Sequence, residues 1–261
     1  MNDRRGGQVG PAGSPGGAVG APKARPGAFL STLGRPAKGQ FAIALDATGS
    51  MGPLIAAARA SIGEIMRRVT AEAGSPVALR LYVYRDYDCV GTSYPVLEQS
   101  DLTADVGTLQ RWLAQREPAG GGGNAGEAVE AALADILRRE EADAVLVAGD
   151  EPSNPKHELR GAQATALELA PRFKERGCPV HMFALGDYPA TITDFKKVSA
   201  ASGGKFGRLD GGPDMIDLAV LAMLSRIKGA SGVREYVAGR ALSDNARSFA
   251  TALLPKPDDK R

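Results

Sequence analysis

Three oxygen-bearing side chains follow the first apolar run of the chain at two-residue intervals. In "FAIALDATGSM", Asp46, Thr48 and Ser50 come directly after a run that is typical of a buried strand. This spacing lets the three side chains turn toward one point as the chain leaves the strand. Carboxylate and hydroxyl oxygens without a neighbouring His or Cys suit a hard cation, in particular Mg²⁺. The same residue types are common helix caps, so the triplet alone leaves both interpretations open.

Two further segments place polar residues in matching positions. "VLVAGDEPSN" puts Asp150 directly after another apolar run, and "GGGGNAGEAV" carries Asn124 and Glu127 in a glycine-rich loop. Ligands of open α/β sheets bind beyond the carboxyl ends of the strands, so we expect these residues to meet the triplet on one rim. Glu127 could pair with a cation there, but we expect it to complete the first turn of the following helix, where the helix dipole favours an acid.

Taken together, these segments resemble those of the von Willebrand factor A (VWA) family. "FAIALDATGSM" resembles the DxTxS segment of its metal-ion-dependent adhesion site (MIDAS). "LRLYVYRDYDC", "GGGGNAGEAVEAAL" and "AVLVAGDEPSN" follow in the order and at the spacings of VWA domains similar to those of alpha-kinase-type proteins. The similarity covers roughly residues 40–228.

The resemblance implies a Rossmann-like VWA fold with a divalent cation, Mg²⁺ or Mn²⁺, at the top of the sheet. It also implies that Thr48 and Ser50 ligate the cation directly, while Asp46 and Asp150 act mostly through water. A carboxylate from a protein partner commonly fills the remaining coordination position in this family. The implied function is therefore binding of a protein partner rather than catalysis.

The glycine-rich segment departs from the family pattern at two positions. Gly123 stands where many VWA domains have Thr, and Asn124 stands where the most similar ones have Asp. Because Asn offers a neutral carbonyl oxygen, the site can retain a ligand there with one negative charge less and a weaker cation affinity. The expected metal ligands are thus Asp46, Thr48, Ser50, Asn124 and Asp150.

Apolar runs alternate with helical patterns along the chain, which predicts an open, mostly parallel α/β sheet with helices on both faces. Strands are expected at residues 40–45, 78–84, 95–98, 142–148, 180–185 and 205–209. Pro95 marks the third as an edge strand, which we expect to be antiparallel. Helices are expected around residues 55–69, 104–115, 126–139, 161–176 and 214–228.

We expect the chain to have four parts. They are a disordered Gly/Pro-rich arm at 1–38, the VWA-like domain at 39–229, a C-terminal helical extension at 230–254 and a tail at 255–261. In the extension, Leu242, Ala246, Phe249 and Leu253 form one apolar stripe behind Ser243, a typical helix cap. We expect this helix to pack back on the domain; the alternative is a helix that docks a partner.

Composition excludes several classes of function. The chain of 261 residues has 32 Lys and Arg against 30 Asp and Glu, so it lacks the basic excess of a nucleic-acid-binding protein. No apolar run approaches the roughly 20 residues of a membrane span, and no segment resembles a signal peptide. Cys89 and Cys178 fall toward opposite edges of the predicted sheet, too far apart for a disulfide. We therefore expect a cytoplasmic protein with no membrane contact.

The chain lacks the residues that three alternative kinds of catalytic or nucleotide-binding site would need. A phosphotransferase of the haloacid dehalogenase type requires a second Asp where Thr48 stands. A serine hydrolase built on Ser50 requires a His with an orienting acid, for which only His157 is eligible. "GGGGNAGE" lacks the Lys of a phosphate-binding loop. We expect no enzyme but a cation-dependent protein-interaction module; the alternatives are a scaffold with a vestigial metal site and a Mg²⁺-dependent hydrolase.

Four other polar residues have plainer interpretations. Arg85 and Asp86 follow the second strand, where we expect an Arg–Asp pair that supports the loops; the alternative is that Asp86 orients metal-bound water. His181 lies inside a predicted strand and is expected in the core, whereas His157 lies in a loop and is expected to be exposed.

Overall fold

Six strands form one sheet in the computed structural model, which describes residues 37–90, 92–120, 126–160 and 164–255. The strands are β1 (Gln40–Asp46), β2 (Ala78–Tyr84), β3 (Leu97–Gln99), β4 (Ala144–Gly149), β5 (Val180–Leu185) and β6 (Phe206–Leu209). β2 and β5 begin and end where the sequence predicts, and β3 begins two residues later than predicted. The expected arm and tail lie almost wholly outside the described residues.

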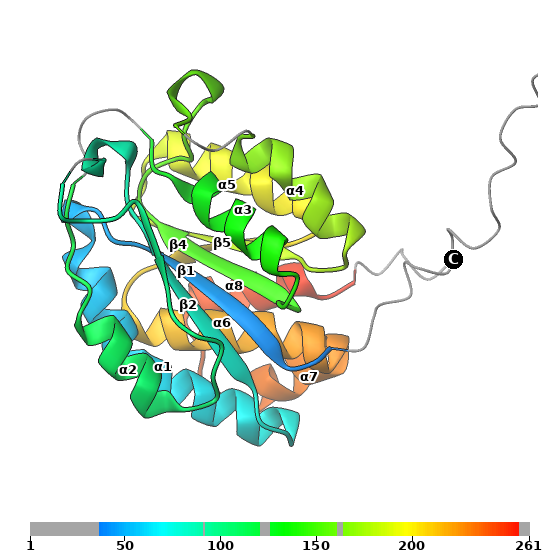
Figure 1. Cartoon of the computed structure of the whole chain (residues 1–261). Coiled ribbons are helices and arrows are strands. Elements are labelled where there is room, and N and C mark those ends of the chain that lie inside the picture. Colours follow the sequence, from blue (N-terminus) through cyan, green and yellow to red (C-terminus); the bar gives the residue numbers. More distant parts are fainter. Residues whose placement is uncertain (1–36, 91, 121–125, 161–163, 256–261) are drawn as a thin grey trace, which may run out of the picture. The chain divides into compact units, whose positions relative to one another are not determined.

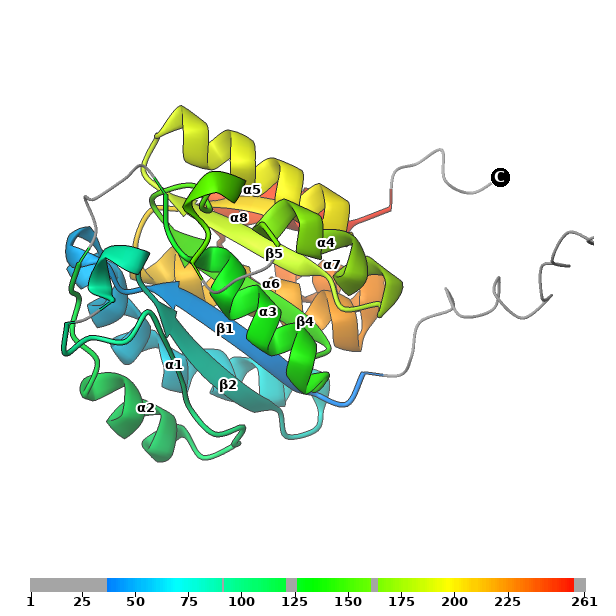
Figure 2. The same ribbon diagram turned by 45° about the horizontal axis from the view of Figure 1, so that its top comes forward.

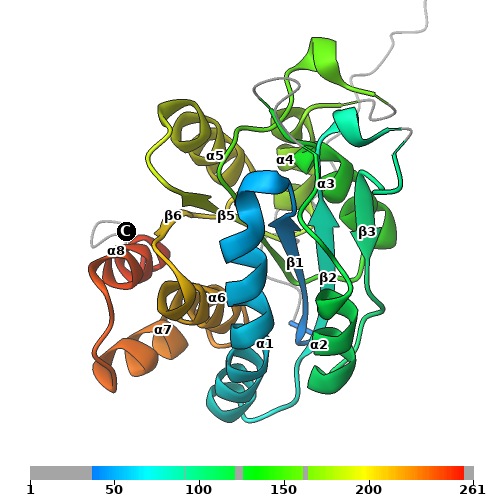
Figure 3. The same ribbon diagram turned by 90° about the vertical axis from the view of Figure 1, so that its left-hand side faces the viewer.

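The strand order in the sheet is β3-β2-β1-β4-β5-β6. Neighbouring strands are parallel except for β3, which pairs antiparallel with β2 at one edge (Figure 3). The expected fold class, an open and mostly parallel Rossmann-like sheet with one antiparallel edge strand, is therefore confirmed. The order of the strands reverses between β1 and β4, and such a switch point opens a crevice at the carboxyl ends of the two strands.

Helices cover both faces of this sheet (Figure 1 and Figure 2). They are α1 (Gly52–Ala73), α2 (Val106–Ala114), α3 (Val129–Arg139), α4 (Ala166–Glu175), α5 (Pro189–Ser202), α6 (Gly212–Ile227), α7 (Gly229–Ala238) and α8 (Asp244–Leu253). In the described part of the chain, three single turns of 3₁₀ helix lie between these elements: η1 (Gly49–Met51), η2 (Tyr87–Cys89) and η3 (Lys156–Glu158). No helix in the described ranges is both long and apolar enough to cross a membrane.

The pleat of β1 divides the core into two layers. Phe41, Ile43 and Leu45 pack with α1, α2, α6, α7 and α8, while Ala42 and Ala44 face α3, α4 and α5. This alternation follows from the two-residue period of a strand. Because β1 is covered on both faces, the polar residue at its carboxyl end is also shielded from water.

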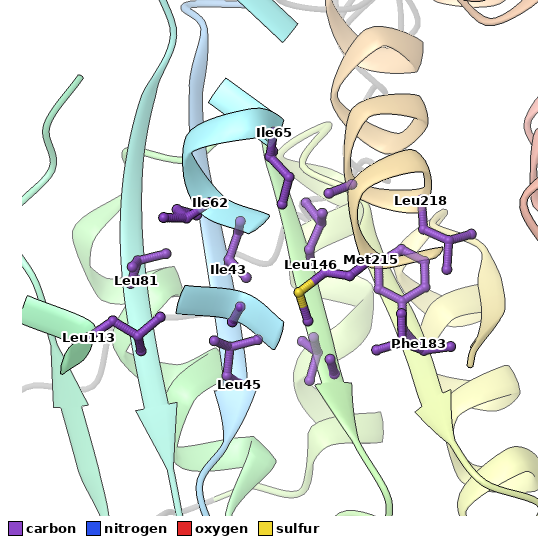
Figure 4. A pocket seen from close by; sticks show the side chains of 15 residues that line it. Ile43, Leu45, Ile62, Ile65, Leu81, Leu113, Leu146, Phe183, Met215 and Leu218 are labelled. Carbon is purple, nitrogen blue, oxygen red and sulfur yellow. The ribbon is translucent and has the colours of Figure 1, made fainter. Parts of the chain in front are cut away.

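The layer between the sheet and helices α1 and α6 contains a cavity of about 30 Å³. Ile43, Leu146, Phe183, Met215 and Leu218 are among the side chains that line it (Figure 4). The lining is apolar, so a water inside it would lack the two to four polar partners that buried water needs.

The C-terminal helix α8 packs on the domain, as expected. Phe249 is buried, and its ring contacts that of Phe183 edge-on with a centroid distance of 5.1 Å. The Ser243 side chain accepts a hydrogen bond from Ala246 N and so caps the helix. The apolar stripe of this helix is therefore used within the chain rather than left open for a partner.

The sequence assigned no helix to α5 and no separate helix to α7, although α7 falls almost wholly within the helical extension expected at 230–254. The buried face of α5 includes Thr191, Ser199 and Ser202 beside two apolar residues, so hydroxyl groups interrupt the apolar stripe. α7 is short, begins at a glycine and buries Gly232 with two larger residues. The two cysteines are both buried and form no disulfide with each other; Cys89 follows β2 and Cys178 precedes β5.

Candidate functional site

Asp46, the last residue of β1, is fully buried and accepts hydrogen bonds from Thr48, two residues further along the chain. Thr48 donates to Asp46 Oδ1 from its backbone N at 2.8 Å and from its hydroxyl at 2.7 Å. Asp46 Oδ2 has no hydrogen-bond partner among the described residues. One oxygen of this carboxylate therefore fixes the turn, and the other is left free.

Ser50 and Asp150 meet across 100 positions of sequence, with the Ser50 hydroxyl donating to Asp150 Oδ2 at 2.8 Å. Leu45 pairs with Ala148 in the β1–β4 ladder, so the residues that follow the two strands leave the sheet side by side. Asp150 Oδ1 is buried, and no described group is its hydrogen-bond partner. The sheet thus brings together four of the five predicted ligands, and each carboxylate keeps one free oxygen.

Helix capping does not account for this triplet. The residue before α1 is Met51, which makes no side-chain cap, and Thr48 makes none for η1. Instead the hydroxyls of Thr48 and Ser50 bond to the two acids. Of the two interpretations that the sequence leaves open, capping of the next helix is therefore excluded for these side chains.

Tyr84 and Gly149 close the floor of the site. The Tyr84 hydroxyl donates to Ala148 O at 3.1 Å, and burial raises the Tyr84 pKa well above its usual range. A Cβ on Gly149 would lie 2.5 Å from that hydroxyl and 3.3 Å from Asp46 Oδ2. The β4 backbone therefore approaches the two side chains so closely that only glycine fits at this position.

Glu127 lies at the same rim, but not in the helix turn where the sequence predicts it. α3 begins at Val129, and Glu127 precedes it, forming an isolated parallel bridge with Ser153. The prediction was wrong because backbone pairing with the loop after β4 holds this residue outside the helix. The side chain is only 4% exposed, and its Oε2 has no partner in the described part of the chain.

Burial and crowding of acids dominate the electrostatics of this rim. Burial raises the pKa of Asp46, and the neighbouring Asp150 raises it further. Burial raises the pKa of Glu127 as well, with the charge of Asp46 as the next cause. None of the ion pairs formed by the described residues includes Asp46, Glu127 or Asp150. This part of the site therefore gathers buried acids that no described basic side chain balances, and their raised pKa values favour the protonated, neutral form.

The expected Arg85–Asp86 pair is wrong. The buried Arg85 guanidinium instead contacts Glu98 Oε1 at 3.1 Å and donates to two backbone carbonyls. Asp86 is also buried and accepts a hydrogen bond from Asn154 Nδ2 at 3.0 Å. Arg85 therefore ties β3 to the end of β2, and Asp86 holds the loop after β4.

Asn124, the fifth predicted ligand, lies outside the described residues, as does Gly123. The two histidines are placed as predicted. The side chain of His157 is 79% exposed, whereas His181 is buried and its Nδ1 accepts a hydrogen bond from Lys205 N at 3.2 Å. Burial lowers the His181 pKa to about 3, so the ring is neutral at physiological pH.

The donor set determines what this rim can bind. Among the described residues, no group of three or more His, Cys, Asp and Glu side chains is gathered closely enough to hold a metal ion. The oxygens that converge instead belong to Asp46, Asp150, Thr48 and Ser50, two carboxylates with two hydroxyls. Mg²⁺ and Mn²⁺ accept such oxygen donors, and Mg²⁺ commonly keeps several waters as further ligands. The free, buried carboxylate oxygens fit a small hard cation of this kind.

No family model and no curated protein matches the chain. Among solved structures, the conserved hypothetical protein BatB from Bacteroides thetaiotaomicron matches with 16% identity and a TM-score of 0.47, covering 76% of this chain and 98% of BatB. The SpRpn10 VWA domain matches with 12% identity and a TM-score of 0.48, covering 70% of this chain and 93% of that domain.

A third match is the von Willebrand factor type A structure from Catenulispora acidiphila. It has 15% identity and a TM-score of 0.46, and the match covers 71% of this chain and 42% of that one. Structures described as VWA domains thus stand among the matches. At these identities and TM-scores the likeness says nothing of function.

Proposed function

We propose that this chain is a protein-interaction module whose binding depends on a divalent cation. Mg²⁺ or Mn²⁺ would be held by Thr48 and Ser50 with Asp46 and Asp150, and Asn124 is a further candidate ligand. A carboxylate of the partner protein would complete the coordination. The cation would supply the positive charge that joins the acidic rim of this chain to the carboxylate of the partner. The chain's own residues would bind the cation and fix its position.

One observation carries the proposal: at the switch point of the sheet, the buried Asp46 and the half-buried Asp150 each keep one buried carboxylate oxygen without a hydrogen-bond partner among the described residues. A buried acceptor without a partner costs free energy, about 1–3 kcal/mol and more for a charged group. A cation between the free oxygens of Asp46 and Asp150 would remove this cost. Two buried cysteines that form no disulfide with each other fit the reducing cytoplasm that we propose as the location.

Calorimetric titration of the full chain with Mg²⁺ and with Mn²⁺ tests the cation site. We expect saturable binding by the wild type and none by Asp46→Ala at the same concentrations. Asn124→Ala should weaken the binding; an unchanged affinity would show that Asn124 is not a ligand. The absence of binding by the wild type at millimolar cation would contradict the proposal and favour a scaffold with a vestigial site.

Partner binding is tested separately, by capture on the immobilised chain in Mg²⁺ and in EDTA. We expect a partner that is retained in Mg²⁺, released by EDTA and absent from immobilised Asp46→Ala. A partner that EDTA does not release would contradict cation dependence even if the cation itself binds.

A further inference from the structure

The backbone of Glu127 is fixed between the ends of two strands. Its N donates to Pro152 O at 2.9 Å, and its O accepts from Asn154 N at 3.1 Å, so the loop after β4 holds it on one side. On the other side, Ala128 N donates to Arg85 O, just after β2, at 3.0 Å. Glu127 therefore lies at the carboxyl end of the sheet, on the same rim as Asp46 and Asp150.

The side chain at this position is an acid without a described counterion. Glu127 is 4% exposed, and its Oε2 has no hydrogen-bond partner among the described residues. The acids whose charges act most strongly on it are Asp46, Asp86, Asp88 and Asp150. Burial, followed by these charges, raises the Glu127 pKa to about 10. Burying an acid among other acids is unfavourable unless a positive charge joins them.

We infer that Glu127 is a further acidic residue of the cation site, which acts on the bound ion through its charge rather than as a direct ligand. This inference rests on the proposed function. Direct ligation is not part of it because no three acidic side chains in the described ranges are gathered closely enough to hold a metal. An acid beyond the ligands still strengthens binding, since groups around a metal site commonly change its affinity 10-fold to 100-fold.

Asp46 and Asp150 are among the acids whose charges act on Glu127, so an ionised Glu127 would add its charge to theirs at the same rim. The alternative is a structural role, in which Glu127 stays protonated in the core and has no effect on the affinity for the cation.

Glu130 provides a matched control on the same segment. It is a buried acid like Glu127, but its Oε1 accepts a hydrogen bond from the Tyr87 hydroxyl at 2.8 Å. The largest causes of its pKa shift are burial and hydrogen bonds, and neither Asp46 nor Asp150 is among them. Glu130→Gln therefore removes one buried acid from the same region without changing the charge that we assign to the cation site.

The experiment is calorimetric titration of the full-length wild type, Glu127→Gln and Glu130→Gln with Mn²⁺ and Mg²⁺ at pH 7.5. Thermal melting in EDTA first verifies that each variant is folded. We expect Glu127→Gln to bind the cation about 10-fold or more weakly than the wild type, and Glu130→Gln to bind within about two-fold of it. Glu127→Asp keeps the charge, and we expect it to retain most of the affinity.

Each other outcome overturns the inference. Unchanged affinity in folded Glu127→Gln would leave a purely structural acid and would not affect the proposed function. Equal weakening by Glu130→Gln, or by Glu127→Asp, would show that packing rather than the charge of Glu127 matters. A wild type that binds neither cation would overturn the inference together with the proposed function. If Glu127→Gln does not fold, the comparison of Glu127→Asp with the wild type decides.

Discussion

Two buried acids of the same type, Asp214 and Asp46, have opposite surroundings. Asp214 lies in the first turn of α6 and accepts hydrogen bonds from Asp210 N at 3.1 Å, from Asn245 Nδ2 at 2.9 Å and from the Ser243 hydroxyl. Both of its oxygens are thus used, and they join α6 to the start of α8. This acid is a structural element of the fold.

Asp46 is more deeply buried than Asp214, yet it uses only one oxygen. Its Oδ1 accepts both bonds from Thr48, while its Oδ2 faces no described donor. The difference shows that burial of an acid does not by itself indicate function. An acid whose two oxygens are both bonded stabilises the chain; an acid with a free oxygen is available to a ligand.

The largest change in stability that tests this comparison is expected from replacing Asp by Asn, which has nearly the same shape, at Asp214 and at Asp46. Asp214→Asn replaces one acceptor oxygen by an NH₂ group that faces the donors around it, so we expect a loss of about 3 kcal/mol in the free energy of unfolding. Asp46→Asn keeps the acceptor for Thr48 and removes repulsion from Asp150, so we expect a change of less than about 1 kcal/mol. Urea denaturation in EDTA measures both.

Equal destabilisation by these two variants would contradict the distinction between the two acids. Cation titration supplies the complementary measurement. We expect Asp214→Asn to bind Mg²⁺ as the wild type does, and Asp46→Asn to bind it much more weakly.

A smaller effect is expected at Glu130, which lies between the two cases, with Oε1 bonded and Oε2 unbonded among the described groups. Burial raises its pKa to about 7 from the usual 4.5. The folded state therefore keeps a proton that the unfolded chain releases, and this contribution to stability is lost as the pH rises from 4.5 through 7. We expect the loss to be about 2 kcal/mol for the cation-free protein.

Glu130→Gln removes this titrating group while keeping its shape. In urea denaturation between pH 5 and pH 8, the variant should lose less stability than the wild type as the pH rises. Parallel stability curves for the two proteins would show that Glu130 does not titrate in this range.

The smallest effect is expected in the apolar layer below the site. Ile43 lies in β1 three residues before Asp46 and lines the cavity of about 30 Å³. Ile43→Val removes one methylene and enlarges that cavity, so we expect a loss of about 1 kcal/mol in the free energy of unfolding. We expect the Mg²⁺ affinity to stay unchanged, because no charge or polar group moves. A weaker affinity would show that the packing of β1 also determines the geometry of the cation site.

The sequence predicts the sheet well because each central strand is a mostly apolar run, interrupted only by Arg80 in β2 and by His181 in β5. β2 and β5 are examples, and the placement of polar residues at their ends follows from the parallel order. The convergence of Ser50 with Asp150 was predictable for the same reason. Periodicity could not identify α5, because Thr191 and Ser199 supply part of its buried face.

Partners that come from elsewhere in the chain were the other source of error. Arg85 pairs with Glu98 of the edge strand instead of with its neighbour Asp86, and Glu127 pairs through its backbone with the loop after β4. Neither contact leaves a local signal in the sequence. The only sequence signal for Glu127 is that an acidic residue stands close to a glycine-rich loop. That it is buried without a basic partner among the described residues becomes clear only from the structure.

The hydrogen bond between Ser50 and Asp150 has a consequence for how the protein is made. During synthesis the segment of residues 46–50 leaves the ribosome about 100 residues before Asp150. Until β4 emerges and pairs with β1, the nascent chain has hydroxyl groups and one acid but no second carboxylate opposite them. A cation that binds the finished site would therefore bind only after β1 and β4 have paired. It would then stabilise this pairing in the completed sheet.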